Sequence, residues 1–238
     1  MKIVFIGHTG FIGKSIYHHL SLSNQIDLKG ISSKEVDLTK KLSDKSLLNN
    51  ISPNCVVIMC AGLKKQLGDN LGSFESNLKI ITNFSKAISE SKPKKIIFFS
   101  SASVYGEDVD YTEEISEKTN VHPRTFYGIG KYAAELLLTK ICSDNEIKLL
   151  IIRPPLVYGK NDKSRGYGPT GFVYKVLNGE EIVIWGDGNE FREFIYVEDL
   201  GRAVEELIKN DTTGVLNFVS GKSYRFKEIV EILNSIKW

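Results

Sequence analysis

The first stretch of the chain constrains the fold more than any other. An apolar run, Lys2–Ile6, leads directly into Gly7, Gly10 and Gly13, and a helical pattern of apolar residues begins at Phe11. Glycines between a buried strand and a helix let the backbone turn tightly and approach a pyrophosphate, which binds the free N–H groups at the helix N-terminus. The dinucleotide fingerprint usually reads G-x-G-x-x-G, whereas this one reads G-x-x-G-x-x-G. The loop alone therefore leaves a simple turn as an equal alternative.

Short apolar runs alternate with amphipathic stretches along most of the 238 residues. The strand candidates are residues 2–7, 26–31, 55–59, 95–100, 147–152, 182–185 and 215–219. The helix candidates are residues 11–22, 40–50, 73–91, 125–142, 171–178, 199–209 and 226–237. This alternation predicts an α/β fold with a doubly wound parallel sheet of the Rossmann type. Ligands of such sheets bind beyond the carboxyl ends of the strands.

Composition excludes several classes of function. The formal net charge of +2 gives no electrostatic basis for binding nucleic acid or a membrane. No apolar run reaches the length of a membrane span, and the chain opens with a strand pattern, not a signal peptide. Cys55, Cys60 and Cys142 lack metal-ligand spacing and lie in apolar segments. We therefore expect reduced core thiols, no metal site and a cytoplasmic location.

Tyr127 and Lys131 lie four residues apart on a predicted helix, so they share one face. A nearby ammonium favours the phenolate and draws a tyrosine pKa of about 10 toward neutrality, where the phenol can act as a general acid or base. Such a pair also arises by chance, and Lys131 could instead pair with Glu135 on an exposed helix face. Ser101 and Ser103 support a functional role for this pair, because they follow a strand at the predicted ligand edge. Serines there are otherwise common turn or cap residues.

Together these residues resemble the extended short-chain dehydrogenase/reductase family, especially its nucleotide-sugar epimerases, dehydratases and reductases. The resemblance covers nearly the whole chain, and the glycine spacing is the one seen in that family. Ser101, Tyr127 and Lys131 match the Ser/Tyr/Lys catalytic triad in order and approximate separation. Arg192 lies in a stretch similar to the substrate-side signature, whose arginine contacts the diphosphate of a sugar nucleotide. The resemblance thus implies that Ser101, Ser103 and Arg192 bind the substrate.

The same resemblance implies a bound NAD(P)(H). The residues it assigns to the cofactor lie in the glycine loop, after the second and third strand candidates, on two helices and after the fifth strand candidate. They are Gly7, Thr9, Gly10, Phe11, Ile12, Gly13, Ser32, Ser33, Lys34, Asp37, Leu38, Ala61, Gly62, Lys64, Asn77, Tyr127, Lys131 and Pro154.

The end of the second strand bears on which cofactor is used. An NAD enzyme of this fold usually places an acidic residue there, to bind the ribose hydroxyls. Here Asp27 lies before the end of the strand and Glu35 lies beyond it. The strand is followed directly by Ser32, Ser33 and Lys34. Two hydroxyls and a lysine suit a 2′-phosphate, so the sequence modestly favours NADP.

The resemblance implies an NAD(P)-dependent nucleotide-sugar oxidoreductase, either a 4-epimerase or a 4-keto-sugar reductase. Dehydration is disfavoured because Ala102 and Ser103 stand where the dehydratases of the family carry two carboxyls. Two alternatives stay open: a short-chain reductase that acts on a non-nucleotide carbonyl, and a non-catalytic NADP-binding redox sensor. An intact Tyr127 and Lys131 argue against the sensor.

The expected organisation has two parts. Residues 1–165 form the NAD(P)-binding Rossmann domain with the triad. Residues 166–238 supply elements of a small and incomplete substrate lobe, interleaved with the last strands and helices of the main domain. Family members commonly dimerise through two helices, for which residues 73–91 and 125–142 are the candidates, so we also expect a homodimer.

Overall fold

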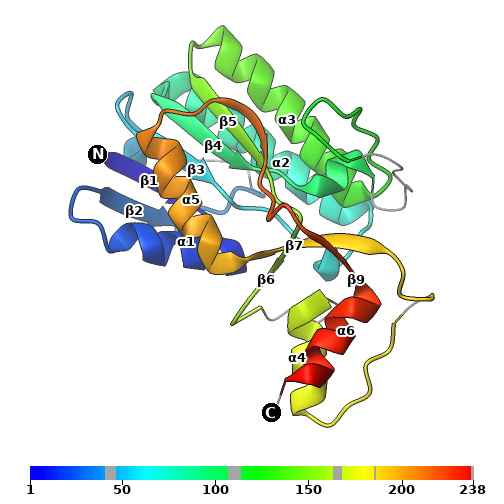
Figure 1. Ribbon diagram of the computed structural model, residues 1–238. Coiled ribbons are helices and arrows are strands. Elements are labelled where there is room, and N and C mark those ends of the chain that lie inside the picture. Colours follow the sequence, from blue (N-terminus) through cyan, green and yellow to red (C-terminus); the bar gives the residue numbers. More distant parts are fainter. Residues whose placement is uncertain (41–46, 107–113, 163–167, 185, 237–238) are drawn as a thin grey trace.

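The structure, a computed structural model, describes residues 1–40, 47–106, 114–162, 168–184 and 186–236. Its larger part is a six-stranded, wholly parallel sheet with the strand order β2-β1-β3-β4-β5-β8 (Figure 1). The strands are β1 (Lys2–Ile6), β2 (Asp27–Ile31), β3 (Val56–Met59), β4 (Lys95–Phe99), β5 (Lys148–Arg153) and β8 (Gly214–Asn217). Strands β3 and β4 are buried throughout, as expected for a sheet covered on both faces.

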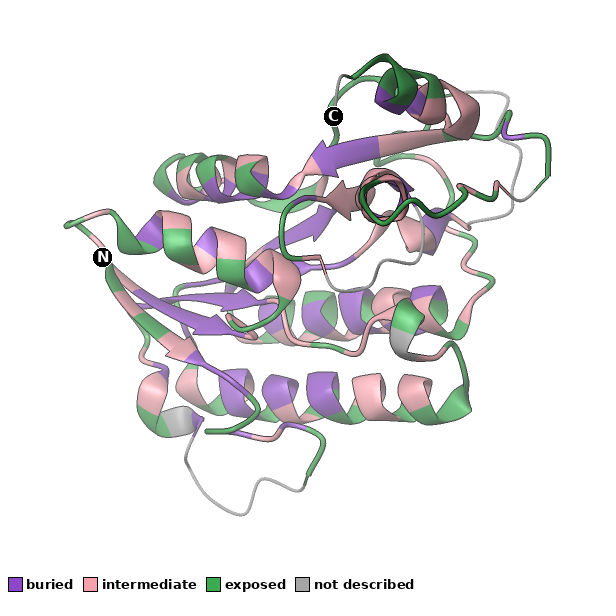
Figure 2. Ribbon diagram, turned by 90° about the horizontal axis from the view of Figure 1, so that it is seen from below, coloured by how far each residue is buried: buried purple, intermediate pink, exposed green. Residues whose placement is uncertain are grey.

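Helices cover both faces of this sheet. On one face lie α1 (Phe11–Ser21) and α5 (Val197–Lys209), and on the other lie α2 (Leu71–Ser91) and α3 (Phe126–Asp144). In Figure 2 the buried strands lie between helices whose outer sides are exposed. Polar side chains begin the two long helices. Asn70 caps α2 by accepting a hydrogen bond from the backbone of Ser73, and Thr125 caps α3 by accepting one from Gly128.

A smaller part extends from the carboxyl edge of the sheet (Figure 1). It contains β6 (Leu156–Tyr158), β7 (Phe191–Tyr196), β9 (Ser223–Arg225), α4 (Gly168–Leu177) and α6 (Phe226–Ser235). Strand β7 pairs in parallel with β6 and antiparallel with β9. This part has its own apolar core, built around Phe172, Phe194, Ile229 and Leu233. Short 3₁₀ helices lie at η1 (Leu48–Asn50), η2 (Lys65–Leu67) and η3 (Ala102–Tyr105).

The predicted α/β fold is confirmed, with three local differences. The strand expected over 182–185 is absent from its described residues, 182–184. Of the helix expected over 40–50, residues 41–46 lie outside the described part, and only the short η1 is seen in the remainder. Strands β6, β7 and β9 were not predicted, because each exists through pairing with a segment that is distant in sequence. Within the described residues, no helix combines the length and the apolar character needed to cross a membrane.

Candidate active site

The glycine loop between β1 and α1 is shaped for close approach of a ligand. Gly7 has φ +87°, and a Cβ there would lie 2.6 Å from the backbone nitrogen of Ala61. A Cβ on Gly13 would lie 2.2 Å from the Gly7 carbonyl oxygen, so only glycine lets α1 begin this close to the strand. Gly10, at the N-cap, makes no side-chain hydrogen bond to the first turn of α1. The first-turn N–H groups therefore face a cradle that fits the pyrophosphate of a dinucleotide.

This loop lies where the order of the strands reverses. The chain passes from β1 to β2 on one side and to β3 on the other, and the loops after these strands are tied together. The Gly7 N–H donates to the Ile31 carbonyl, and the Cys60 N–H donates to the Ile6 carbonyl, each over 2.9 Å. In α/β folds the crevice at such a switch point is the ligand site.

The stretch after β3 carries three of the predicted cofactor residues next to a fourth on α2. Asn77 accepts a hydrogen bond from the Leu63 N–H over 2.8 Å and donates to the Leu63 carbonyl over 3.2 Å. Gly62 faces the Asn77 amide, and Ala61 lies against Gly7. The Lys64 ammonium is 5.1 Å from the centre of the Phe11 ring and 3.7 Å from the Asp162 carboxylate. The pairing of Lys64 with Asp162 was not predicted.

Tyr127 and Lys131 lie in the first two turns of α3, and Lys131 reaches the carboxyl end of β4. The Lys131 ammonium lies 5.7 Å from the centre of the Tyr127 ring and donates to the Phe99 carbonyl over 2.7 Å. Burial lowers the pKa of Lys131 to about 8, although the charges of Cys60 and Glu135 oppose this effect. Lys131 does not make the surface ion pair with Glu135 that the sequence left open.

Ser101 and Ser103 lie at the start of η3, directly after β4. The Ser101 hydroxyl accepts from the Ser103 N–H over 3.2 Å and contacts the Ser103 hydroxyl at 3.1 Å. A Cβ on Gly128 would lie 2.6 Å from the Ser103 carbonyl oxygen, so α3 approaches this loop closely. The structure therefore brings the three predicted catalytic residues to one edge of the sheet.

The end of β2 differs from the sequence expectation in detail. Ser32 is buried and donates its backbone N–H over 2.7 Å, and also its hydroxyl, to the Glu35 carboxylate. These hydrogen bonds lower the pKa of Glu35. Ser33 and Lys34 are exposed. Of the two cofactor candidates that follow, Leu38 is a core residue and Asp37 accepts hydrogen bonds from Thr39.

Two further predicted residues lie on opposite sides of the site. Pro154 is buried after β5, and its carbonyl accepts from the Ala102 N–H over 2.9 Å. Arg192 lies on β7 in the smaller part, where its guanidinium donates to Glu190 over 2.7 Å and to the Phe191 carbonyl over 2.9 Å. Arg192 thus forms an ion pair with a residue two positions before it in the sequence.

Three buried polar residues beside the triad were missed by the sequence reasoning. Glu135, Arg153 and Tyr105 form a hydrogen-bonded chain under the Ser101 loop. A signal for one of them was present, because Glu135 lies one helical turn beyond Lys131 on the same face. Its arginine partner is 18 residues away in sequence, and no local pattern connects the two.

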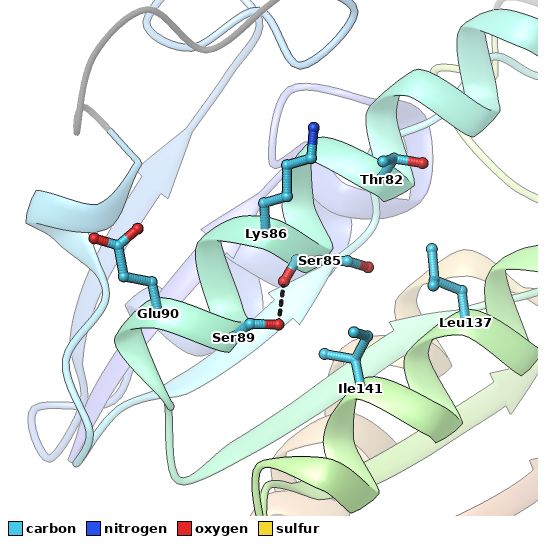
Figure 3. Close-up of a pocket in the computed structure, with 7 residues that line it drawn as sticks. All are labelled: Thr82, Ser85, Lys86, Ser89, Glu90, Leu137 and Ile141. Carbon is cyan, nitrogen blue, oxygen red and sulfur yellow. Dashed lines mark hydrogen bonds between the residues drawn. The ribbon is translucent and has the colours of Figure 1, made fainter.

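A groove on the helical face of the fold is away from these residues. It lies between α2 and α3, with a volume of about 480 Å³ (Figure 3), and is lined by Thr82, Ser85, Lys86, Ser89, Glu90, Leu137 and Ile141. Ile141 lies fourteen residues along α3 from Tyr127, about 20 Å by helical rise. This groove is therefore separate from the candidate active site.

The fold and the glycine loop define the class of protein, an enzyme of the short-chain dehydrogenase/reductase type. The sequence matches the NAD dependent epimerase/dehydratase family over residues 3–218, and the chain belongs to that family. GDP-L-colitose synthase of Yersinia pseudotuberculosis is 26% identical over 99% of this chain and 82% of its own length. GDP-6-deoxy-D-talose 4-dehydrogenase of Aggregatibacter actinomycetemcomitans is 26% identical over 99% of this chain and 80% of its own length.

Solved structures agree with this placement. UDP-N-acetylglucosamine 4-epimerase of Methanobrevibacter ruminantium, in complex with UDP-N-acetylmuramic acid, has a TM-score of 0.82 at 26% identity. The match covers 98% of this chain and 81% of that one. UDP-glucuronic acid 4-epimerase of Bacillus cereus, in complex with NAD, has a TM-score of 0.81 at 22% identity, covers 99% of this chain and 83% of that one, and shows the shared fold.

Proposed function

We propose that the protein is an NAD(P)-dependent nucleotide-sugar oxidoreductase that acts at the sugar C4, as a 4-epimerase or a 4-keto-sugar reductase. The observation that carries the proposal is the placement of Tyr127 and Lys131 on α3 against the Ser101 loop, beside the glycine loop. The relatives named above include a 4-epimerase and a 4-dehydrogenase of nucleotide sugars, which supports chemistry at C4.

Each residue of the triad has a distinct proposed task. Ser101 orients and polarises the reacting oxygen by hydrogen bonding. Tyr127 moves the proton to or from that oxygen, and the Lys131 ammonium favours the phenolate and holds the nicotinamide ribose. A bound nicotinamide supplies the hydride exchange with the sugar carbon. Ala102 and Ser103 offer no carboxyl for eliminating water, which favours these reactions over dehydration.

The dinucleotide would extend from the glycine loop toward Ser33 and Lys34. We propose NADP, because a serine and a lysine are exposed at the end of β2, where a 2′-phosphate would lie. The Glu35 carboxylate opposes this choice, since it is held next to the same position by Ser32. Equilibrium binding of NADH and NADPH, monitored by nucleotide fluorescence, decides between them. Tighter NADH binding that is lost in Glu35→Gln would show that Glu35 takes the ribose hydroxyls.

The substrate would lie between the two parts of the chain, residues 1–165 and the lobe elements of 166–238. Arg192 is the proposed diphosphate ligand, because a guanidinium can donate two hydrogen bonds at once to phosphate oxygens. Its pairing with Glu190 is largely exposed, with side chains 34% and 60% accessible, and such pairs are weak enough for a diphosphate to replace. Arg192→Ala should therefore weaken sugar-nucleotide binding, whereas the surface control Arg202→Ala should not.

The same family resemblance leads us to propose a homodimer formed through α2 and α3. On α3, Phe126, Ile129 and Leu136 are 40%, 41% and 55% exposed, and their spacing places them on one side of the helix. The groove of Figure 3 adds Leu137 and Ile141 to this surface. A second copy of α2 and α3 would cover these side chains.

The test of the proposed activity begins with the purified protein and its bound nucleotide. UDP-, GDP- and dTDP-sugars, including 4-keto sugars, are then added while the absorbance of the reduced cofactor is followed. A reductase consumes NAD(P)H in proportion to product, whereas an epimerase interconverts sugars without net consumption. Tyr127→Phe should lower kcat by about 10²–10⁴-fold, with Tyr132→Phe on the same helix as the control. An unchanged kcat in Tyr127→Phe would exclude the proposed chemistry.

A further inference from the structure

A buried ion pair lies directly beneath the Ser101 loop. The Glu135 carboxylate accepts two hydrogen bonds from Arg153, from Nε over 3.0 Å and from Nη2 over 2.6 Å. The two side chains are only 4% and 6% exposed. The Ser100 hydroxyl also donates to Glu135, so the carboxylate is bonded both to Arg153 on β5 and to the residue that directly follows β4.

The pair continues into a chain of hydrogen bonds across the carboxyl edge of the sheet. Arg153 Nη1 donates to the phenol oxygen of Tyr105 over 2.7 Å, and this phenol donates to Asn217 over 2.8 Å. The Asn217 N–H then donates to Glu117 over 2.7 Å, in the segment that leads to α3. The chain therefore connects α3, β5, η3, β8 and the segment before α3.

One end of this arrangement holds the backbone around Ser101. The Ser100 N–H donates to the Ile152 carbonyl over 2.8 Å, and the Ala102 N–H donates to the Pro154 carbonyl over 2.9 Å. Both acceptors are the chain neighbours of the arginine. The segment of β5 that carries the guanidinium therefore also supplies both backbone acceptors on either side of Ser101.

The other end holds Lys131. Glu135 follows Lys131 by one turn on the same face of α3, while Lys131 donates to the Phe99 carbonyl just before Ser100. The same two segments, α3 and the end of β4, are thus joined twice. One bond comes from the Lys131 ammonium and one from the Glu135 carboxylate.

We propose that Glu135 and Arg153 are positioning residues, which set the separation between Ser101 and the Tyr127–Lys131 face. This inference rests on the proposed function above. Stability alone does not explain the pair, because apolar residues of similar volume are often at least as stable in the place of a buried ion pair. Placement does explain it, since a misplacement of about 1 Å can lower a rate about 100-fold.

The pKa of Lys131 depends on the groups around its ammonium, so a change in that pKa reports a change in Glu135 or Arg153. These groups are Cys60 after β3, Tyr127 on the same helix, and Glu135 with Arg153 behind it. Removing the negative charge of Glu135 leaves the cation of Arg153 uncompensated on that side. The pKa of Lys131 should then fall, so that activity is lost at a lower pH.

Three variants test the proposal. Glu135→Gln removes the charge but keeps the shape of the side chain. The double variant Glu135→Met/Arg153→Met replaces the pair with apolar side chains. Leu138→Ala is the control, because Leu138 is a buried core residue one turn further along α3 with no part in the hydrogen-bonded chain. For each we would measure kcat, KM, the pH profile and thermal unfolding.

We expect kcat to fall about 100-fold in Glu135→Gln, with a smaller change in KM and an alkaline limb moved to lower pH. The double variant should fold with a Tm near that of the wild type and still show the loss in kcat. Leu138→Ala should lower Tm and leave the pH profile unchanged. A folded double variant with wild-type kcat, or an alkaline limb unmoved in Glu135→Gln, would overturn the proposal.

An assay of the wild type distinguishes a failure of the positioning role from a failure of the proposed function. If the wild type turned over none of the nucleotide sugars, that function would fail, and NADH or NADPH binding would replace kcat as the readout. Glu135→Gln should still move the alkaline limb of nucleotide affinity to lower pH, because Lys131 is the proposed ribose ligand. An unmoved limb in that assay would overturn the positioning role by itself.

Discussion

Replacing Lys131 by methionine should stabilise the nucleotide-free protein at neutral pH. A pKa of about 8, against an ordinary value of 10.5, means that burying this ammonium costs about 3 kcal/mol of folding free energy. The variant also loses the hydrogen bond from the ammonium to the Phe99 carbonyl, which contributes about 2 kcal/mol because the donor is charged. The expected net gain at pH 7 is therefore about 1 kcal/mol.

This gain should depend on pH with a definite sign. Below pH 8 the ammonium is charged in both the folded and the unfolded chain, so the folded wild type carries the full cost. Between pH 8 and 10.5 the folded protein loses the proton first, and the cost is progressively removed. The wild type therefore gains stability relative to the variant over this range. Near pH 10.5 only the lost hydrogen bond remains, and the difference reverses sign.

The assay is urea unfolding followed by far-UV circular dichroism at a series of pH values from neutral to alkaline. The difference in unfolding free energy between variant and wild type at each pH removes the contributions of groups that titrate in both proteins. Lys140→Met is the control, because Lys140 lies on the same helix with a side chain 73% exposed. Saturating nucleotide should stabilise the wild type more than Lys131→Met. A variant less stable than the wild type at pH 7, by an amount independent of pH, would refute the reasoning.

Three other substitutions test the glycine loop, the core and the proposed dimer surface. Gly13→Ala places a Cβ 2.2 Å from the Gly7 carbonyl oxygen, so we expect a loss of about 1–3 kcal/mol in thermal unfolding and weakened NADH binding in a fluorescence titration. Leu138→Ala should cost about 2–5 kcal/mol in urea unfolding because Leu138 is fully buried, and a smaller loss would mean that the core closes around the gap. Leu136→Glu puts a charge on the exposed face of α3 and should convert a dimer to a monomer in light scattering. A wild type that is already monomeric would disprove the proposed interface.

Several features of this protein could be predicted because their signals are local. The strand, glycine loop and helix at Lys2–Ser21 follow from adjacent residues, since backbone geometry limits which residues can make that turn. The alternation of strands and helices likewise predicts a parallel sheet, because each strand needs a crossover before the next. Tyr127 and Lys131 share a face for the same reason, being one helical turn apart.

Features that depend on contacts between distant segments could not be predicted. Strand β7 exists through pairing with β9, and the stretch 182–184 lacks such a partner strand although its apolar residues suit one. Which segments pair depends on how the rest of the backbone brings them together.

The sequence by itself determined the family, the sheet and the order of the catalytic candidates, because each of these depends on short local motifs and on their order along the chain. Only the tertiary structure decided how those candidates are held. Glu135 could have faced solvent beside Lys131, and instead it is buried against Arg153, where an unpaired charge would be very costly. The physical reason is that burial and ion pairing join segments far apart in the chain. Such pairing is settled when β4, β5 and α3 come together.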